Sequence, residues 1–511
     1  MRFTPCSMVT SCAPLRFVCF AASSVRVFQR PCSSWPVRAV PLFLFPMHAR
    51  YRPAAIWRLT RKELRRSWLN YGVLWVGAIL VGLAAVQFAN WTNDVLAIFL
   101  GWIDGRAWLA LLITPALTGG AVWMTRKWFS GSEGSGIPQV IAALHGQPDP
   151  TRIRRLFGLR ILIGKIGLGL LGMLGGLTLG REGPTVHIGA SIMYEMRRFY
   201  PRVSLRMERL LLLAGSAAGL SGAFNTPLAG ILFAIEELTR SFEVRTNGVL
   251  ITSIVFSGLV SLALAGNYLY FGQITAPDIF PLAFVLPVVI AAVVCGLAGA
   301  AFNLALLKQV RWIPAKVLAW RERSPLAWGA GLGLLVAIIG IASAGQTWGS
   351  GYEQARHLLM NHGEQVSWYY PLVKWLTMVL SYITGLPGGL FSPSLSIGAG
   401  FGQWVSQWFG QYPQSALVAI CMVGYLAAVT QSPLTSFVIV MEMINGGGLV
   451  IPLMATALIS SRVANLFTPP LYEALAEQKY FAPLGDASQR KAQPEAQAAE
   501  TVAVTVDEKP R

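Results

Sequence analysis

Four short stretches place glycine and proline inside strongly apolar sequence, and each has the pattern of a helix start. They are Gly134-Ser135-Gly136-Ile137-Pro138, Gly180-Arg181-Glu182-Gly183-Pro184, Gly388-Gly389-Leu390-Phe391-Ser392-Pro393 and Thr468-Pro469-Pro470-Leu471-Tyr472. Proline suits the first turn of a helix, because the N–H group that it lacks would have no partner there. At membrane depth the free N–H groups of a helix start need a partner, and the start carries about half a positive charge. The pattern therefore predicts a site for a small anion, with hydroxyl groups from Ser135 and Tyr472.

Several such helix starts must converge for the site to work. One start contributes roughly 0.3 to 1 kcal/mol, or up to about 2 when partly buried. Removing a small ion from water has a penalty of several kcal/mol. Converging starts with hydroxyl groups can match that penalty, and we expect weak binding near the millimolar range, about 4 kcal/mol. Weak binding suits transport because the ion must also leave. The alternative is that these glycines and prolines only permit close packing and kinks of helices.

Two glutamates are candidates for proton chemistry. Glu182 lies in an apolar region, where an acid is expensive and is by default a functional candidate. Beside a helix start its carboxylate can occupy an anion position until protonation removes the charge that holds it; the alternative is a static helix cap or a partner of Arg181. Glu236 and Glu237 end a helix expected at Asn225–Leu238, whose Asn-Thr-Pro start is a good cap pattern. Taken alone, such a pair beside Arg240 is usually solvated.

The elements that must position these residues are membrane helices. Of the 511 residues, 54% are hydrophobic and 13% are charged, against about 25% charged in ordinary soluble domains. Apolar stretches long enough to span a bilayer recur from Leu69 onward, for example Leu69–Ala89, Ala107–Met124 and Ala327–Ala344. The composition excludes an ordinary soluble enzyme and predicts an all-α polytopic membrane protein.

The net charge of +18 is concentrated near the start of the chain. No basic face alternates with aromatic residues on a soluble module, so nucleic acid is not an expected partner. Six basic residues between Arg52 and Arg66 precede the first span with only Glu63 opposing them, which predicts a cytoplasmic N-terminus. Asp94 and Asp104 are expected to follow that span on the other side.

The two ends of the chain are expected to lie outside the membrane fold. Residues 1–50 contain six arginines, no lysine, no acid and four of the six cysteines. They resemble a transit peptide, but we favour translation upstream of a true start at Met47, which makes 1–46 a non-structural extension. The tail at 483–511 is expected to be disordered and cytoplasmic. Cys295 and Cys421 lie in apolar runs and no CxxC occurs, so no metal site, disulfide framework or cofactor is expected.

The four stretches resemble the four signatures of the CLC family of chloride channels and proton-coupled chloride exchangers, in family order from residue 134 to 472. The resemblance implies a homodimer in lipid in which each subunit has its own ion pathway. It also implies two inverted halves of tilted and broken helices, here 69–270 and 271–482, after a cytoplasmic basic helix at 47–68. Broken helices in corresponding positions are typical of a midplane site in an inverted-repeat transporter.

The resemblance also assigns roles. Ser135 and Tyr472 would donate hydroxyl hydrogen bonds to a central chloride that backbone N–H groups near Leu390 and Phe391 complete; nitrate-preferring relatives have proline in place of this serine. Glu182 matches the gating glutamate and Glu237 the internal proton glutamate. The residues expected to support the site are Gly134, Gly136, Pro138, Lys165, Arg181, Gly183, Pro184, Gly389 and Pro393, of which Lys165 matches a family lysine thought to raise the local potential.

The resemblance therefore predicts an exchanger of chloride and protons, not an enzyme, in a bacterial inner membrane with both termini cytoplasmic. Gln139 departs from the family, in which many members have glutamate, and no region long enough for paired CBS domains follows Tyr472.

The first alternative is a passive voltage- or pH-gated chloride channel. A remote alternative is an intramembrane serine protease, because Gly219-Leu220-Ser221-Gly222 resembles the GxSG of rhomboid proteases. A serine nucleophile needs a base within reach, and His357 and His362 lie in a polar stretch.

Overall fold

The computed structural model describes residues 71–481, apart from 147–149, 201–202, 241–246, 267–268, 275–280, 310–312 and 361–365. The chain divides into two units, Met1–Arg61 and Lys62–Arg511, and every described residue belongs to the second. The expected N-terminal extension, basic helix and C-terminal tail therefore lie outside the described residues.

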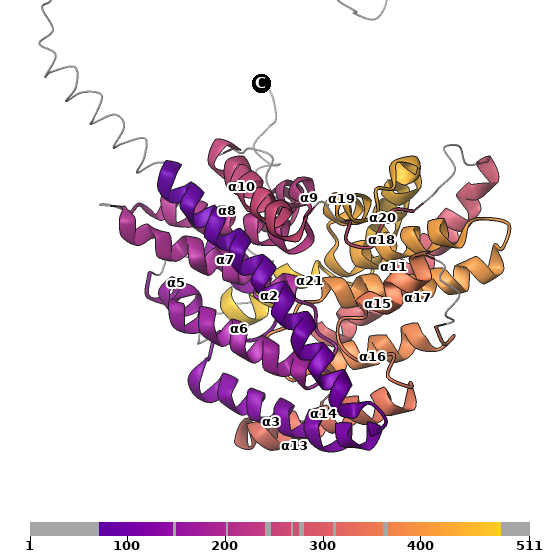
Figure 1. Ribbon diagram of the computed structural model, residues 1–511, viewed down its shortest axis with the longest axis horizontal. Helices are drawn as coiled ribbons and strands as arrows, with labels where there is room; N and C mark the ends of the chain where they lie inside the picture. The colour runs from indigo at the N-terminus through magenta and orange to yellow at the C-terminus, as the bar shows by residue number, and fades with distance from the viewer. Residues whose placement is uncertain are drawn as a thin grey trace, which may run out of the picture. The chain divides into compact units, whose positions relative to one another are not determined.

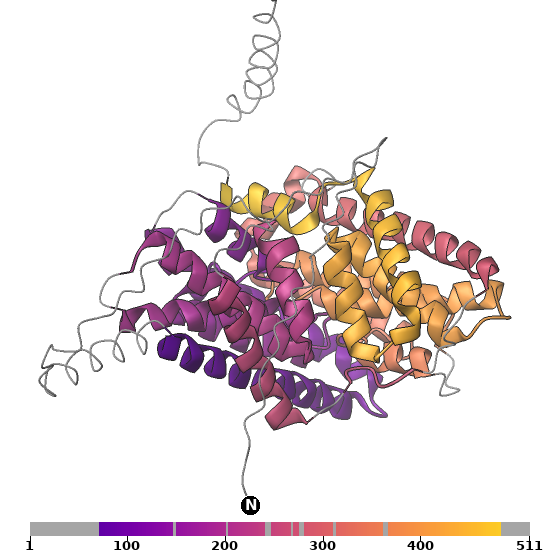
Figure 2. The same ribbon diagram turned by 90° about the horizontal axis from the view of Figure 1, so that it is seen from above.

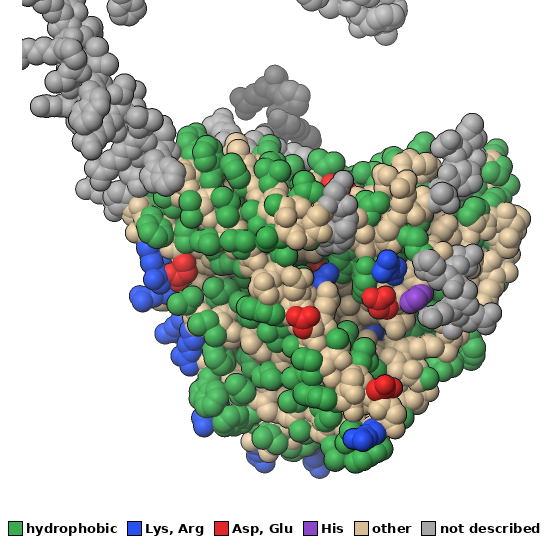
Figure 3. Space-filling model, in the orientation of Figure 1, with side chains coloured by type: hydrophobic (Ala, Val, Ile, Leu, Met, Phe, Trp, Pro, Cys, Tyr) green, Lys and Arg blue, Asp and Glu red, His purple; other side chains and the backbone are tan. Residues whose placement is uncertain are grey.

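Helices make up nearly all of the regular structure in the described part of the chain (Figure 1), which confirms the all-α prediction. Seven helical segments of this part are long and apolar enough to cross a membrane: Val73–Ile103, Ala107–Trp128, Thr151–Leu174, Gly248–Ala265, Leu282–Leu307, Pro325–Ala342 and Gly447–Asn465. Apolar side chains cover much of the face in Figure 3, and Lys and Arg lie mainly at its left and lower edges. Such exposed apolar surface is stable against lipid and not against water, so this is a multi-pass membrane protein.

The first half of the described chain ends before the linker at residue 266. Its helices and single turns are α2 (Val73–Ile103), η2 (Ala107–Leu109), α3 (Ala110–Trp128), α4 (Ile137–His145), α5 (Pro150–Phe157), α6 (Leu159–Leu174), α7 (Glu182–Met196), η3 (Arg197–Phe199), α8 (Leu205–Phe224), α9 (Pro227–Phe233), η4 (Ala234–Thr239) and α10 (Asn247–Ala265). Many are too short to cross a membrane.

The second half begins after the linker. It consists of η5 (Leu282–Phe284), α11 (Val285–Leu307), α13 (Ala315–Arg323), α14 (Pro325–Ala342), α15 (Tyr352–Met360), α16 (Tyr370–Ile383), α17 (Phe391–Trp408), α18 (Gln414–Thr430), α19 (Pro433–Ile444), η6 (Gly447–Leu449), α20 (Val450–Asn465), α21 (Leu471–Ala476) and η7 (Glu477–Phe481). Figures 1 and 2 show the two halves side by side, indigo to magenta and salmon to yellow. Helix α21, the last in the chain, packs against α4 of the first half.

Short helices form the buried centre. In α18 every residue from Ala416 to Thr430 is buried. Helices α7 and α8 cross at two glycines: a Cβ on Gly189 would lie 2.2 Å from the carbonyl oxygen of Gly215. The missing side chains let the two backbones touch, which is how small residues drive helix packing in membranes. Among the helices of this centre, α7 and α17 begin with buried residues.

Two helix boundaries differ from the sequence prediction. Helix α2 runs to Ile103, so Asp94 lies inside it and does not follow it, whereas Asp104 is its C-cap residue. The helix continues because its polar residues Asn90 and Asn93 line a cavity, and a second apolar run follows them.

The helix predicted at Asn225–Leu238 begins later. Asn225 has a left-handed backbone, with φ 57°, and ends α8 by donating its N–H to Ser221. The next helix, α9, starts at Pro227 and changes to a π-helix at Ala234. Asn225 therefore serves as the C-cap of the preceding helix, a position at which Asn tolerates the left-handed conformation.

Candidate functional site

Backbone hydrogen bonds join three of the four predicted stretches. Gly180 donates its N–H to the oxygen of Gly389 over 2.8 Å, and Gly389 donates back to Gly180 over 2.6 Å. Gly134 accepts from the N–H of Gly388 over 3.3 Å and donates to Leu386 over 3.2 Å. Helices α4, α7 and α17 therefore begin beside one another, although their sequences are far apart.

Glycines allow this close approach. A Cβ on Gly183 would lie 2.5 Å from Ser135 Oγ, and one on Gly389 would lie 2.8 Å from the backbone nitrogen of Gly183. Gly136 has a φ of 98°, and a Cβ there would lie 2.5 Å from the Cβ of His187. These positions exclude any side chain, because contacts below 3.0 Å require something to shift. The prolines follow at the first turns of the helices: Pro138 in α4, Pro184 in α7 and Pro393 in α17.

The fourth stretch adds Tyr472 to the same place. Its ring stacks on Phe391 of α17, with centroids 6.2 Å apart and an interplanar angle of 15°. The Tyr472 side chain is fully buried, and its hydroxyl lacks a hydrogen-bond partner within the described residues. It lies beside the side chain of Ser135, which is also buried. Two buried hydroxyl groups thus lie near the start of α17.

Glu182 is the first residue of α7 and reaches the start of α17. Its carboxylate is 0% exposed. One oxygen accepts the hydroxyl of Ser392 and the other accepts the Ser392 N–H over 3.4 Å. A Cβ on Gly180 would lie 2.7 Å from this second oxygen, so glycine leaves the room that the carboxylate occupies. A negative group at a helix start is electrostatically favourable.

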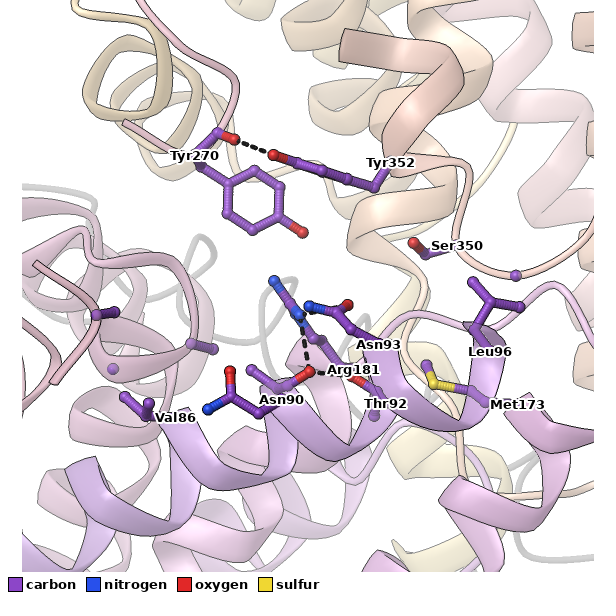
Figure 4. A pocket seen from close by; sticks show the side chains of 15 residues that line it. Val86, Asn90, Thr92, Asn93, Leu96, Met173, Arg181, Tyr270, Ser350 and Tyr352 are labelled. Atoms are coloured by element: carbon purple, nitrogen blue, oxygen red, sulfur yellow. Dashed lines mark hydrogen bonds between the residues drawn. The ribbon is translucent and has the colours of Figure 1, made fainter. Parts of the chain in front are cut away.

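Arg181, which lies close to this carboxylate, also lines a cavity of about 340 Å³ (Figure 4). Its Nε lies 3.8 Å from Glu182 Oε1, and its guanidinium donates to Ala89 O over 3.2 Å and to Asn93 Oδ1 over 3.1 Å. The cavity is also lined by Tyr270 and Tyr352. A cation at the mouth of a cavity raises the local concentration of anions.

Glu237 is buried at the start of α19. Its Oε2 accepts the Ser432 hydroxyl, whereas Oε1 is buried without a hydrogen-bond partner in the described part of the chain. Its neighbour Glu236 accepts the backbone N–H groups of Leu434 over 3.1 Å and Thr435 over 2.6 Å. The pair is therefore packed into the protein, unlike the solvated pair that these residues alone suggest.

A second carboxylate makes the reciprocal contact with a helix start. Glu442 of α19 accepts the N–H groups of Leu228 over 3.2 Å and Ala229 over 2.8 Å, at the start of α9. The start of α19 is thus capped by Glu236, which lies in η4 directly after α9, and the start of α9 is capped by Glu442, which lies in α19. The sequence prediction did not include Glu442. The available signal was the shared spacing, because each glutamate follows a Pro-Leu pair by the same distance.

We expect Glu442→Gln to lower the free energy of unfolding by about 1 to 2 kcal/mol, because hydrogen bonds to a charged group contribute more than those to a neutral one. Thermal unfolding of the detergent-solubilised protein measures this change. Glu477→Gln, at an exposed position of η7, is the control and should leave the midpoint unchanged. Equal midpoints for both variants would contradict a stabilising cap.

Two buried lysines hold the loops on either side of the site. Lys165 Nζ donates to Ser132 O over 2.8 Å and to Gly134 O over 2.9 Å, directly before Ser135. Lys374 Nζ donates to Thr347 O over 2.9 Å and to Gly349 O over 2.8 Å. Lys374 was also missed, although the sequence holds a signal: it is the lone basic residue of α16, as Lys165 is of the apolar part of α6.

Ser221 has a packing role. Its hydroxyl donates to Ile254 O over 3.4 Å, between α8 and α10. His145 and His187 bond to the carbonyls of Leu238 and Leu156. The surroundings of Ser221 therefore do not support the protease alternative, and His362 lies outside the described residues.

Helices that begin inside the protein, with their starts joined by backbone hydrogen bonds, define a class of protein: a multi-pass membrane protein of broken helices. The chain belongs to the voltage-gated chloride channel family, the CLC family, whose model matches residues 117–465.

Similar proteins include named exchangers. The H(+)/Cl(-) exchange transporter ClcA of Salmonella paratyphi A is 29% identical over 440 residues, which cover 81% of this chain and 90% of that protein. ClcA of Citrobacter koseri is 29% identical over 445 residues, which cover 82% and 90%. The crystal structure of a slow cyanobacterial Cl-/H+ antiporter has a TM-score of 0.67 and 26% identity, covering 80% of this chain and 98% of that one. A CLC-type fluoride/proton antiporter, 18% identical with a TM-score of 0.67 over 78% of this chain and 97% of its own, shares the fold.

Proposed function

We propose that this protein exchanges chloride for protons across a bacterial inner membrane, with Glu182 as both gate and proton acceptor. The observation that carries the proposal is the carboxylate of Glu182, fully buried at the start of α17 where an anion would bind. The ClcA relatives and the cyanobacterial antiporter, which are named for chloride and proton exchange, support it.

Chloride would bind beside Glu182 through uncharged donors. These are the hydroxyls of Ser135 and Tyr472 and the backbone N–H groups of Leu390 and Phe391. Their partial charges lower the cost of dehydrating chloride without trapping it, which gives weak binding and rapid release. The Tyr472 hydroxyl supports this role, because it is buried beside Ser135 and its ring stacks on the first residue of α17.

The gate works by competition between two negative groups. An ionised Glu182 occupies the start of α17 and excludes chloride from that position. A protonated Glu182 has lost the charge that held it there, so chloride can replace it. The proton comes from the cytoplasm through Glu237. Two observations support this role: Glu237 is buried, and its Oε1 has no hydrogen-bond partner in the described structure. Chloride movement is thereby coupled to the protonation of the gate.

The larger organisation follows the same proposal. The halves are 69–270 and 271–482, supported by the reciprocal caps of α9 and α19 and by the paired lysines. Both termini would lie in the cytoplasm; for the N-terminus, this is supported by the basic residues near Arg61 that precede the first span. The protein forms a homodimer in lipid, and exposed apolar residues such as Leu259 and Ile451 are available for a partner or for lipid.

Reconstituted vesicles test the exchange. An inward chloride gradient should drive protons outward through the wild-type protein, recorded with a pH electrode while a chloride electrode follows the anion. Chloride flux without proton movement would favour the passive channel.

Ser135→Pro should shift the anion preference toward nitrate, because proline removes both the hydroxyl and one backbone donor. The ratio of nitrate to chloride transport in vesicles measures the shift, and we expect an increase of about tenfold, the value of one hydrogen bond of about 1.4 kcal/mol. Ser132→Ala, a buried serine in the preceding loop, serves as control. An unchanged ratio in Ser135→Pro would remove this residue from selectivity.

A further inference from the structure

Ser392 contacts the gate directly, and the chemistry proposed above does not use its side chain. Its backbone N–H and its hydroxyl both bond the carboxylate of Glu182. A serine hydroxyl has one hydrogen and two acceptor sites. Because this hydrogen goes to Glu182, Ser392 Oγ remains able to accept a hydrogen bond from elsewhere.

Tyr270 is in place to provide that bond. Its hydroxyl oxygen lies 3.4 Å from Ser392 Oγ. Since the serine hydrogen is used, the phenol is the donor, and the two hydroxyls form a directed chain that ends on the carboxylate. Hydrogen bonds in such chains polarise and strengthen one another.

The position of Tyr270 is well defined. Its backbone oxygen accepts the Tyr352 hydroxyl over 2.7 Å, drawn in Figure 4, and its ring meets the edges of neighbouring aromatic rings. The Arg181 guanidinium carbon lies 5.4 Å from the ring centre. Tyr270 also lines the 340 Å³ cavity, so the chain connects this cavity with the gate.

We propose that Ser392 and Tyr270 are positioning residues that form a latch, which holds the carboxylate of Glu182 at the start of α17. The latch rests on the proposed function and specifies how the closed gate is held. A hydrogen bond to an ionised carboxylate is stronger than one to a protonated carboxyl group. The latch therefore holds the ionised gate and releases the protonated one.

Three other titratable or charged groups face Glu182. Arg181 comes from the same loop, Tyr270 from the linker between the halves and Tyr472 from α21. Arg181 also favours the ionised carboxylate, but it does so equally with and without the Ser392 hydroxyl. The effect of the latch can therefore be separated from that of Arg181 by changing Ser392 alone.

Chloride flux in vesicles at neutral and at acidic outer pH tests the latch. Ser392→Ala should raise chloride turnover at neutral pH by about fivefold, within the range that one hydrogen bond to a charged group allows. At acidic outer pH, where protonation would release the gate in the wild type as well, the chloride turnover of the variant should approach that of the wild type. The pH profile of the variant should therefore be flatter. Tyr270→Phe keeps the ring and should act in the same direction with a smaller effect. Ser394→Ala is the matched control, because Ser394 is buried in the same helix and its hydroxyl lacks a partner in the described structure.

A second background isolates the contact with Glu182. In Glu182→Gln the ionised carboxylate is absent, so adding Ser392→Ala should give no further increase. An equal rise in this background, an equal rise at both pH values or no rise at all would each overturn the latch. If Ser392→Ala does not fold, Tyr270→Phe provides the same comparisons. Absence of proton movement in the wild type would refute the exchanger and leave these chloride measurements intact, so the two failures are distinguishable.

Discussion

Glu182→Ala is expected to abolish proton movement while chloride continues to flow. Alanine has neither the charge that closes the start of α17 nor a group that binds a proton. Chloride then has free access to the position that the carboxylate occupies, and its flux should lose its dependence on pH. A chloride gradient across vesicles that contain the variant should consequently leave the outer pH constant.

The loss of proton movement should be large, because the groups around Glu182 cannot replace it as a proton acceptor. Among the groups that contact the carboxylate, Arg181 and Ser392 cannot take over its proton chemistry near neutral pH. Proton flux should therefore fall below detection. Glu195→Ala is a matched control, since Glu195 lies in the same helix but pairs with Arg198 near its other end. Coupled proton movement through Glu182→Ala would mean that another residue is the gate.

Glu237→Ala should produce the second large loss. The buried carboxyl group beside Ser432 disappears, and the proposed path from the cytoplasm to Glu182 is interrupted. Chloride should still pass, because Glu237 is not one of the groups proposed to bind it. We expect proton flux to fall by at least about tenfold, as a general acid or base typically contributes a hundredfold or more.

The neighbours of Glu237 offer the control for this result. Glu473 lies partly exposed and pairs with Arg240, so Glu473→Ala should retain coupling. Proton and chloride fluxes from the same vesicles give the ratio for each variant. Normal coupling in Glu237→Ala would show that a different acid supplies the gate, and Glu236, one residue away, would be the next to replace.

Much of the site could be predicted because its signals are local. A proline in a first turn, glycines where a side chain would clash, and an acid in an apolar stretch are properties of a few adjacent residues. Helix starts at Ile137, Glu182, Phe391 and Leu471 agree with this expectation. Helix lengths were less predictable. Helix α2 continues past Asp94 because its polar residues line a cavity. The hydropathy of the segment does not reveal which face of the helix lies toward such a cavity.

What the sequence determined by itself was the membrane environment, the buried helix starts and the small set of residues able to bind an anion or a proton. Only the tertiary structure decided which of these residues meet. The contacts of Ser392 with Glu182 and of Glu442 with Ala229 each span more than 200 residues. Such contacts depend on how one half packs against the other, because a hydrogen bond needs two groups within about 3 Å. Local sequence sets the chemistry of each group, and the packing of the halves sets its partner.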